Sequence, residues 1–175
     1  MDLSIIIVTY NSEKYILGCL KSITRSTQNI QHEIFIIDNK SMDQTQLFIR
    51  QFSNSFTLIE NKENYGFAKA VNRGLGKVSG EFILLLNPAV LIKSDSLQPI
   101  IDFMRNNPKV GVCGSRLLNE DGSLQYSKGS FPTLSSTIFR MFLPRKIRKY
   151  HWWGYERVGE CDWVTGASMI IRKKM

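Results

Sequence analysis

Apolar residues occur along this chain in short unbroken runs, and the clearest run covers Phe82 to Leu86. It follows Gly80-Glu81 and ends at Asn87-Pro88. A run this short, closed by turn residues, predicts a strand buried on both faces, as in a parallel sheet covered by helices. Proline cannot donate to a β-ladder, so the strand is predicted to end at Asn87. Ligands of open α/β sheets bind beyond the carboxyl ends of the strands, so residues 87–89 are expected to face a ligand.

Three more runs alternate with segments of helical periodicity. The runs are Leu3 to Val8, Glu33 to Ile37 and Thr57 to Ile59, and each predicts a strand. Apolar residues spaced by three or four positions predict helices between them. The helical positions are Tyr15, Ile16, Cys19, Leu20 and Ile23, then Leu47, Phe48 and Phe52, then Ala70, Val71, Leu75 and Val78, and finally Leu97, Ile100, Ile101 and Met104. This order predicts an α/β fold with a mostly parallel sheet and helices on both faces.

Polar residues mark the starts of the first two helices. Asn11 or Ser12 is expected to cap the first. Ser41 and Gln44 have the spacing of a capping box, which predicts the start of the second.

The pattern changes after residue 110. Asp121-Gly122 predicts the turn of a hairpin, and residues 163–171 return to a strand-like composition. We therefore divide the single domain into an α/β half over residues 1–115 and the start of a second half over residues 116–175. Because the chain stops soon after its last strand, the fold is expected to be incomplete at the C-terminal end. The exposed strand edge left there would favour homo-oligomers.

Composition limits the class of protein. The 175 residues suit one domain, and no apolar run reaches the roughly 18 residues that a spanning helix needs. No basic n-region precedes the first strand, so no signal peptide is predicted. Cys19, Cys113 and Cys161 are odd in number and widely spaced, which favours reduced core thiols in a cytoplasmic protein.

The net charge of +8 favours an anionic partner. Basic and aromatic residues gather in one late segment, which holds Phe139, Arg140, Phe142, Arg145, Lys146, Arg148, Lys149, His151, Trp152 and Trp153. This composition suits a peripheral contact with the anionic inner face of a membrane, and a solvated loop over an acceptor cleft is an equal alternative. Because the basic cluster is confined to one late segment, no nucleic-acid partner is expected.

Polar residues that follow the first two predicted strands are candidates for nucleotide recognition. Asp38 can accept hydrogen bonds from a base edge or a ribose hydroxyl. Thr9, Tyr10 and Asn11 add a hydroxyl, an aromatic face and an amide. The alternative is that Asn11 and Asp38 only cap helices and turns. No glycine-rich dinucleotide fingerprint or phosphate loop occurs, which argues against NAD enzymes and P-loop NTPases.

Six motifs in this order resemble those of family 2 glycosyltransferases, and most nearly the rhamnosyltransferase-like branch. They are Ile6 to Asn11 (IIVTYN), Ile37 to Asp43 (IDNKSMD), Glu63 to Ala68 (ENYGFA), Asn72 to Gly74 (NRG), Leu85 to Pro88 (LLNP) and Asp162 to Ala167 (DWVTGA). The resemblance runs from Leu3 to the end of the chain. It implies a GT-A fold, a UDP- or dTDP-sugar donor, and transfer to a glycan or lipid-linked acceptor in polysaccharide or cell-wall biosynthesis.

The resemblance also implies roles for single residues. Donor-binding residues would be Thr9, Tyr10, Asn11, Asp38, Asn64, Gly66, Asn72 and Asn87, and acceptor-side residues would be Trp163, Thr165 and Gly166. Other interpretations stay open, since Asn64 and Gly66 also suit a tight turn, and Asn72 and Arg73 a solvated helix face.

The sequence departs from the family pattern in two places. Members carry a metal-binding carboxylate where this chain has Ala89, so Asn87 is at most the one neutral ligand left. The Mg²⁺ or Mn²⁺ of the family therefore lacks its usual ligand. Members also continue into an acidic helix that supplies the general base, which is expected here beyond Met175. The chain's own acidic residues are interpreted as cap, turn or surface groups: Asp43, Asp95, Asp102, Glu120, Asp121 and Asp162.

Three hypotheses follow. The chain is the donor domain of a glycosyltransferase, or a non-catalytic nucleotide-sugar-binding domain that lacks the metal aspartate and the base, or an α/β interaction module with a vestigial nucleotide site. Nucleotide binding separates the first two hypotheses from the third.

Overall fold

The computed structural model describes residues 1–52, 55–131, 133–134 and 158–174. The basic aromatic segment over residues 139–153, and with it the predicted membrane contact, lies outside the described residues. The chain divides into two compact units, Met1–Cys113 with Gly166–Met175, and Gly114–Thr165. The predicted division into halves at residue 115 stays a prediction. The structure groups residues 166–175 with the first unit.

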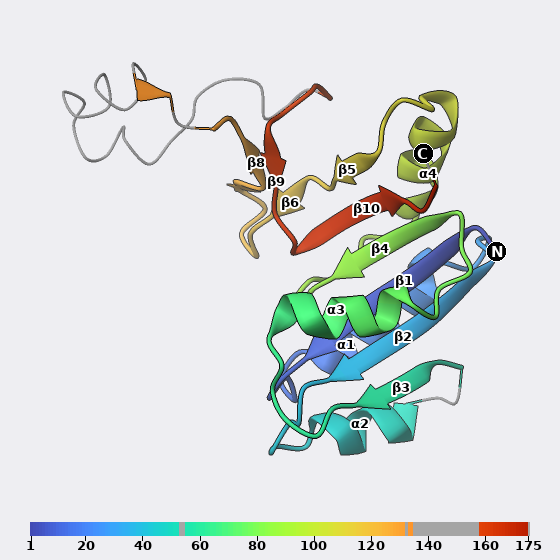
Figure 1. Ribbon diagram of the computed structural model, residues 1–175, viewed down its shortest axis with the longest axis vertical. Coiled ribbons are helices and arrows are strands. Elements are labelled where there is room, and N and C mark those ends of the chain that lie inside the picture. Colours follow the sequence, from blue (N-terminus) through green and yellow to red (C-terminus); the bar gives the residue numbers. More distant parts are fainter. Residues whose placement is uncertain (53–54, 132, 135–157, 175) are drawn as a thin grey trace. The chain divides into compact units, whose positions relative to one another are not determined.

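The first unit is built on a six-stranded sheet with the strand order β3-β2-β1-β4-β10-β5 (Figure 1). Its strands are β1 (Leu3–Thr9), β2 (His32–Asp38), β3 (Thr57–Glu60), β4 (Phe82–Leu86), β5 (Val112–Gly114) and β10 (Ser168–Arg172). Strands β1 to β4 pair in parallel, and β10 runs antiparallel to β4. The predicted mostly parallel sheet is confirmed.

Helices cover both faces of this sheet. α1 (Ile16–Ser26), α2 (Thr45–Phe52) and α4 (Leu97–Asn106) share one core, and α3 (Phe67–Leu75) packs on the other face. Alternating side chains of β1 pack into the two cores, because successive residues of a strand point to opposite faces. Ile5 and Ile7 belong to the first core and Ile6 to the second. Every residue of β4 is buried, as expected for a strand covered on both sides.

Both predicted helix caps are wrong. α1 begins at Ile16, and neither Asn11 nor Ser12 caps it, because the cap position is Tyr15, which makes no side-chain cap hydrogen bond. α2 begins at Thr45, well after Ser41. The Ser41 hydroxyl donates instead to the carboxylate of Asp38, and a charged acceptor makes the stronger hydrogen bond.

The last predicted strand is interrupted. Residues 163–171 form β9 (Trp163–Val164) and β10, with three residues between them. β10 has a neighbour on each side, β4 and β5. The expectation of an exposed edge at this strand is therefore wrong, because the short β5, which the sequence did not predict, covers it.

The second unit holds two small antiparallel pairs. β6 (Leu117–Leu118) pairs with β7 (Leu124–Gln125), and β8 (Lys128–Gly129) pairs with β9. Gly122 has a φ of 81°, which favours glycine, so the predicted hairpin turn is confirmed.

Cysteines and membrane spans add two findings. Cys19 is buried, and burial raises the pKa of its thiol to about 12, whereas Cys161 is exposed and does not fit the predicted core thiol. Within the ranges that the structure describes, no helix has the length and apolar character needed to cross a bilayer.

Candidate functional site

The carboxyl ends of β1, β2, β3 and β4 lie at one edge of the sheet, because these strands are parallel. Thr9 pairs with Asp38 and Asp38 with Glu60 in the strand register. Ligands of such sheets bind at this carboxyl edge. The predicted donor-binding residues in the loops after these strands belong to one compact unit.

Asp38 is the centre of a polar framework at this edge. Its side chain is completely buried, and its carboxylate accepts four hydrogen bonds. The Thr9 hydroxyl donates at 2.8 Å, the Ser41 hydroxyl and backbone N–H at 2.5 and 2.9 Å, and the Gln46 side-chain amide at 2.6 Å. A buried carboxylate needs such partners, since an unpaired one would cost several kcal/mol. Asp38 therefore holds the two loops in register, and its direct contact with a base or ribose stays a prediction.

Asn11 joins the loop after β1 to the loop after β2. Its backbone N–H donates to the Ser41 hydroxyl at 2.9 Å, and its side-chain oxygen accepts from the Met42 N–H at 2.9 Å. Its φ of 49° lies in the left-handed region, which asparagine tolerates better than most residues. The Asn11 side chain is thus engaged in shaping the loop.

A second set of bonds ties the same two loops together. Asp43 accepts from the Glu13 N–H at 3.1 Å and from the Thr45 N–H at 3.0 Å, while Glu13 accepts from the Gln44 N–H at 2.9 Å. Partial burial raises the pKa of Asp43, but the hydrogen bonds from Thr45 and Glu13 outweigh it and bring that pKa below its ordinary range. Both carboxylates are therefore occupied by backbone donors.

A buried row of amides continues the framework to β3 and α3, and sequence reasoning missed it. Asn39 is 2% exposed, accepts from the Asn61 side chain at 2.7 Å and donates to the Gly66 carbonyl at 3.3 Å. Arg73 in turn donates to the Asn61 side-chain oxygen at 2.5 Å and lies near the Tyr65 ring. The available signal was a polar residue directly after a strand, as at Asn39 after β2 and Asn61 after β3.

The loop before α3 is shaped by Gly66. This glycine has a φ of 76°, and its N–H donates to the Asn64 side-chain oxygen at 2.9 Å. The predicted tight turn is thus present, and the Asn64 side chain itself is exposed. A Cβ on Gly166 would lie 3.6 Å from the ring of Phe67, so this predicted acceptor-side residue lies beside the start of α3.

The turn after β4 is closed by Asn87. Its side-chain oxygen accepts from the Ala89 N–H at 2.9 Å, its carbonyl accepts from the Val90 N–H at 3.0 Å, and its own N–H donates to Ala167 at 2.8 Å. Asn87 and Ala89 are both exposed. Position 89 therefore presents an exposed methyl group, and its contact with a ligand stays a prediction.

The predicted donor residues thus separate into two groups. Thr9, Asp38 and Gly66 build the framework together with Asn11, whereas Tyr10 is 50% exposed. Asn64, Asn72 and Asn87 are exposed as well. Thr9 and Asp38 are buried and Asn11 and Gly66 are exposed, but the hydrogen bonds of all four shape the loops; the ligand contacts of Tyr10, Asn64, Asn72 and Asn87 stay a prediction.

Trp163 and Thr165 belong to the second unit. The Trp163 indole N–H donates to the Ser130 carbonyl at 3.3 Å, and the Thr165 N–H donates to the Ser127 carbonyl at 2.8 Å. These contacts fold β9 onto β8, and the acceptor role of both residues stays a prediction.

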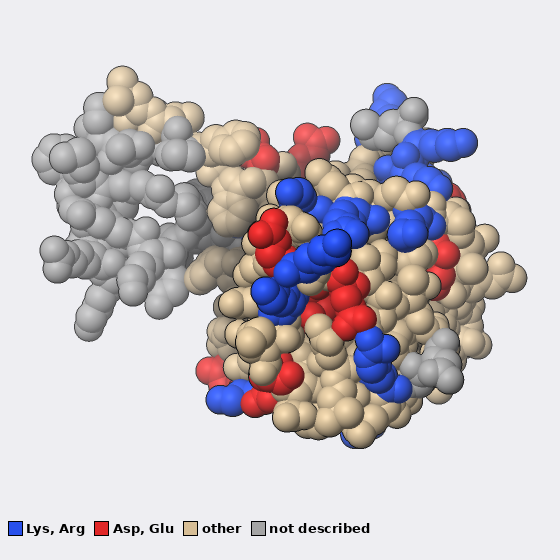
Figure 2. All heavy atoms as spheres, turned by 60° about the horizontal axis from the view of Figure 1, so that its bottom comes forward, with Lys and Arg blue, Asp and Glu red and all other residues tan. Residues whose placement is uncertain are grey.

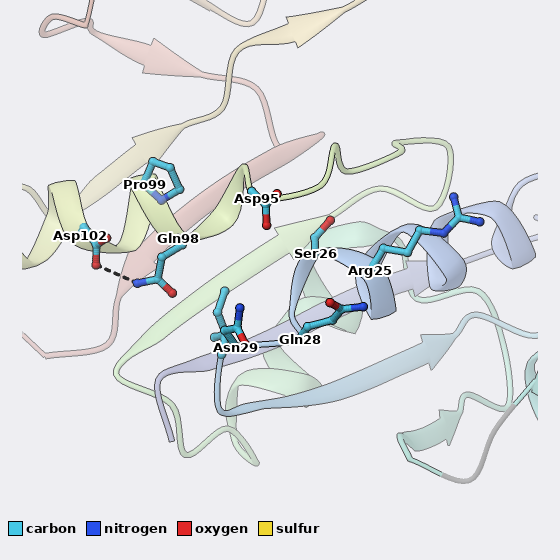
Figure 3. A pocket seen from close by; sticks show the side chains of 9 residues that line it. Arg25, Ser26, Gln28, Asn29, Asp95, Gln98, Pro99 and Asp102 are labelled. Atoms are coloured by element: carbon cyan, nitrogen blue, oxygen red, sulfur yellow. Dashed lines mark hydrogen bonds between the residues drawn. The ribbon is translucent and has the colours of Figure 1, made fainter.

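A groove of about 310 Å³ lies elsewhere on the first unit, between the end of α1 and the start of α4 (Figure 3). Arg25, Asp95 and Asp102 line it with several amides, and none of the predicted donor-binding residues does. In the view of Figure 2, Lys and Arg side chains form a band beside acidic groups. Positive charge is thus also present outside the basic aromatic segment.

A mostly parallel sheet of this topology, with a polar framework at its carboxyl edge, defines an α/β domain of the GT-A type. The chain belongs to glycosyl transferase family 2, whose sequence profile matches residues 4–168. The predicted GT-A fold and family are confirmed.

One relative is the N-acetylglucosaminyl-diphospho-decaprenol L-rhamnosyltransferase of Mycobacterium tuberculosis, 24% identical over 193 residues that cover 98% of this chain and 61% of that protein. The structure of residues 1–349 of TarS from Staphylococcus aureus in complex with UDP is 26% identical, with a TM-score of 0.64, and the match covers 73% of this chain and 39% of that one. TarS is a poly(ribitol-phosphate) β-N-acetylglucosaminyltransferase. The chain thus spans only part of the length of both proteins.

The mannosyltransferase PcManGT of Pyrobaculum calidifontis, solved with GDP-Man and Mn²⁺, shares the fold with a TM-score of 0.60 at 24% identity, over 67% of this chain and 35% of that one. A divalent metal is thus present in the structure of one neighbour of this fold.

Proposed function

We propose that this chain is the donor-binding part of a glycosyltransferase that transfers a sugar from a nucleoside-diphosphate sugar. The observation that carries the proposal is the ordered carboxyl edge, where a buried framework around Asp38 supports an exposed rim of polar and aromatic side chains. Family membership over residues 4–168 supports it, and so does the similarity to TarS, which was solved with UDP. The donor proposed is a UDP- or dTDP-sugar.

The exposed rim supplies the proposed ligand contacts. Tyr10 offers a ring for stacking on a base, and Asn64, Asn72 and Asn87 offer amides for ribose hydroxyls and phosphate oxygens. Thr9 and Asp38 act through the loops that they hold. Trp163, Thr165 and Gly166 are proposed for the acceptor side.

The general base of the transfer is not assigned to any described residue. An inverting transfer needs a base within hydrogen-bond reach of the acceptor hydroxyl. The carboxylates of Asp38, Glu13 and Asp43 at the carboxyl edge already accept protein hydrogen bonds. We propose that the base lies beyond residue 175, and the chain alone is expected to bind donor without turning it over.

The proposed acceptor is a glycan or a lipid-linked saccharide. The relatives named above act on a decaprenol-linked sugar and on poly(ribitol phosphate), which supports both classes. A cytoplasmic location, peripheral membrane contact through residues 139–153 and homo-oligomers remain part of this proposal.

Calorimetric titration of UDP, dTDP and GDP into the purified chain tests the proposal. We expect binding in the high micromolar range or weaker, about −5 kcal/mol. Tyr10→Ala should weaken binding severalfold, because it removes the exposed ring, while Tyr126→Ala, an exposed tyrosine in the second unit, should leave it unchanged. Failure of all three nucleotides to bind would contradict the proposed function.

A further inference from the structure

The turn after β4 lacks the ligands of a hard cation. Ala89 is exposed and ends in a methyl group, and the side-chain oxygen of Asn87 already accepts the Ala89 N–H. Mg²⁺ and Mn²⁺ take oxygen ligands, and at a nucleotide site Mg²⁺ is usually held by one or two protein carboxylates together with phosphate oxygens and waters. One neutral amide oxygen does not meet that need. Across the described ranges, no group of three His, Cys, Asp or Glu side chains is placed to hold a metal.

The loops after the other strands carry cations instead. Lys14, Lys40 and Lys62 follow β1, β2 and β3, and all three are exposed. Among the described residues, no carboxylate lies within ion-pair distance of any of them. Their charge is therefore available to an anionic ligand at this edge.

The carboxylates of the same region are largely occupied. Glu13 and Asp43 accept backbone N–H groups, and Glu60 pairs with Arg50 at 2.6 Å. Glu63 is the one other carboxylate in the loops that follow β1, β2 and β3, and it is exposed. Hydrogen bonds from neutral N–H groups leave Glu13 and Asp43 charged, so these loops carry no net positive charge. The three lysines are nevertheless cations that no carboxylate of the described residues pairs, and ammonium groups of this kind suit the phosphates of a diphosphate.

We propose that this site binds the nucleoside diphosphate of its donor without a divalent metal, with Lys14, Lys40 and Lys62 neutralising the phosphates. The inference rests on the proposed function and specifies how its donor is held. It sets this chain apart from the mannosyltransferase that was solved with Mn²⁺.

The first test compares UDP affinity in Mn²⁺ and in EDTA, by calorimetry on the full chain. The unmodified chain should bind UDP equally in both, within about twofold. Ala89→Asp adds one carboxylate at the exposed position, so Mn²⁺ should strengthen UDP binding about tenfold, or about 1.4 kcal/mol. Ala89→Asn is the matched control, because it adds the same bulk without charge, and it should show no Mn²⁺ effect. Far-UV circular dichroism and thermal midpoints establish that each variant is folded.

The second test concerns the lysines. The triple variant Lys14→Gln/Lys40→Gln/Lys62→Gln should lose UDP affinity about tenfold or more while uridine affinity stays unchanged, since uridine has no phosphate. The control Lys21→Gln/Lys77→Gln/Lys109→Gln removes the same charge away from the carboxyl edge and should bind UDP as before. Added salt should weaken UDP more than uridine.

Several outcomes overturn the inference. A tenfold effect of Mn²⁺ on the unmodified chain would show that a metal site exists without residue 89. No effect of Mn²⁺ on Ala89→Asp would show that this position does not face the phosphates. An unchanged triple variant would remove the lysines from the site. In these three cases UDP still binds and the proposed function stands, whereas absence of any nucleotide or uridine binding would remove both proposals.

Discussion

Neighbouring residues at the carboxyl edge differ in burial, and therefore in whether they hold the loops or are accessible to a ligand. Thr9 and Asp38 are fully buried and hydrogen-bonded to each other. Tyr10, the residue directly after Thr9, is half exposed. A sequence pattern such as TYN marks the position of the edge, but it cannot tell which side chain turns inward. That choice depends on partners from other loops, here Ser41 and Gln46.

Asp38→Asn tests the framework role. The substitution keeps the size of the side chain but replaces one carboxylate oxygen by an NH₂ group. In one orientation this NH₂ group faces the N–H donors of Ser41 and Gln46, and in the other it faces the hydroxyl of Thr9. We expect the free energy of unfolding to fall by about 2–3 kcal/mol, because a buried charged network is broken. Urea denaturation measures it. The control Asp102→Asn, at an exposed helix position, should change stability by less than about 0.5 kcal/mol. A stable Asp38→Asn protein would mean that the four hydrogen bonds contribute little.

At the scale of elements, predictions succeeded where the local pattern decides the structure. β4 spans Phe82–Leu86 as predicted, because a continuous apolar run is closed by glycine and proline. They failed where a distant partner decides. Ser41 fits a capping box locally but bonds to Asp38, and β5 forms only because β10 arrives beside it. The amide row through Asn39 and Asn61 likewise needs three loops at once, which no local pattern records.

Asp43 links the loops after β1 and β2, and its contribution to the free energy of unfolding should fall at acid pH. Because the pKa of Asp43 is lowered in the folded protein, its stabilisation is complete above the unfolded value of about 4 and is lost as the pH falls through the folded value. Urea midpoints of the chain and of Asp43→Asn should therefore differ by a constant amount above about pH 5 and converge below about pH 4. Curves that stay parallel down to pH 3 would contradict the assignment.

At the scale of the whole molecule, the fold accounts for the place of the proposed donor site. Four parallel strands bring the loops after β1, β2, β3 and β4 to one edge, and the helices pack on the two faces of the sheet. The order of strands and helices predicted this edge from the sequence alone. The groove between α1 and α4 was not predicted, because no motif falls on its residues, and it provides an internal reference for binding elsewhere.

The central claim is that a nucleoside diphosphate binds at the carboxyl edge, and NMR mapping with UDP tests it most directly. In ¹⁵N-labelled protein, amide shifts should change in the loops over residues 10–14, 39–43, 61–66 and 87–90, with Tyr10 and Asn64 among the largest. Residues 25–30 and 95–102 of the groove should stay unchanged. Shifts concentrated in the groove, or none at saturating UDP, would contradict this account.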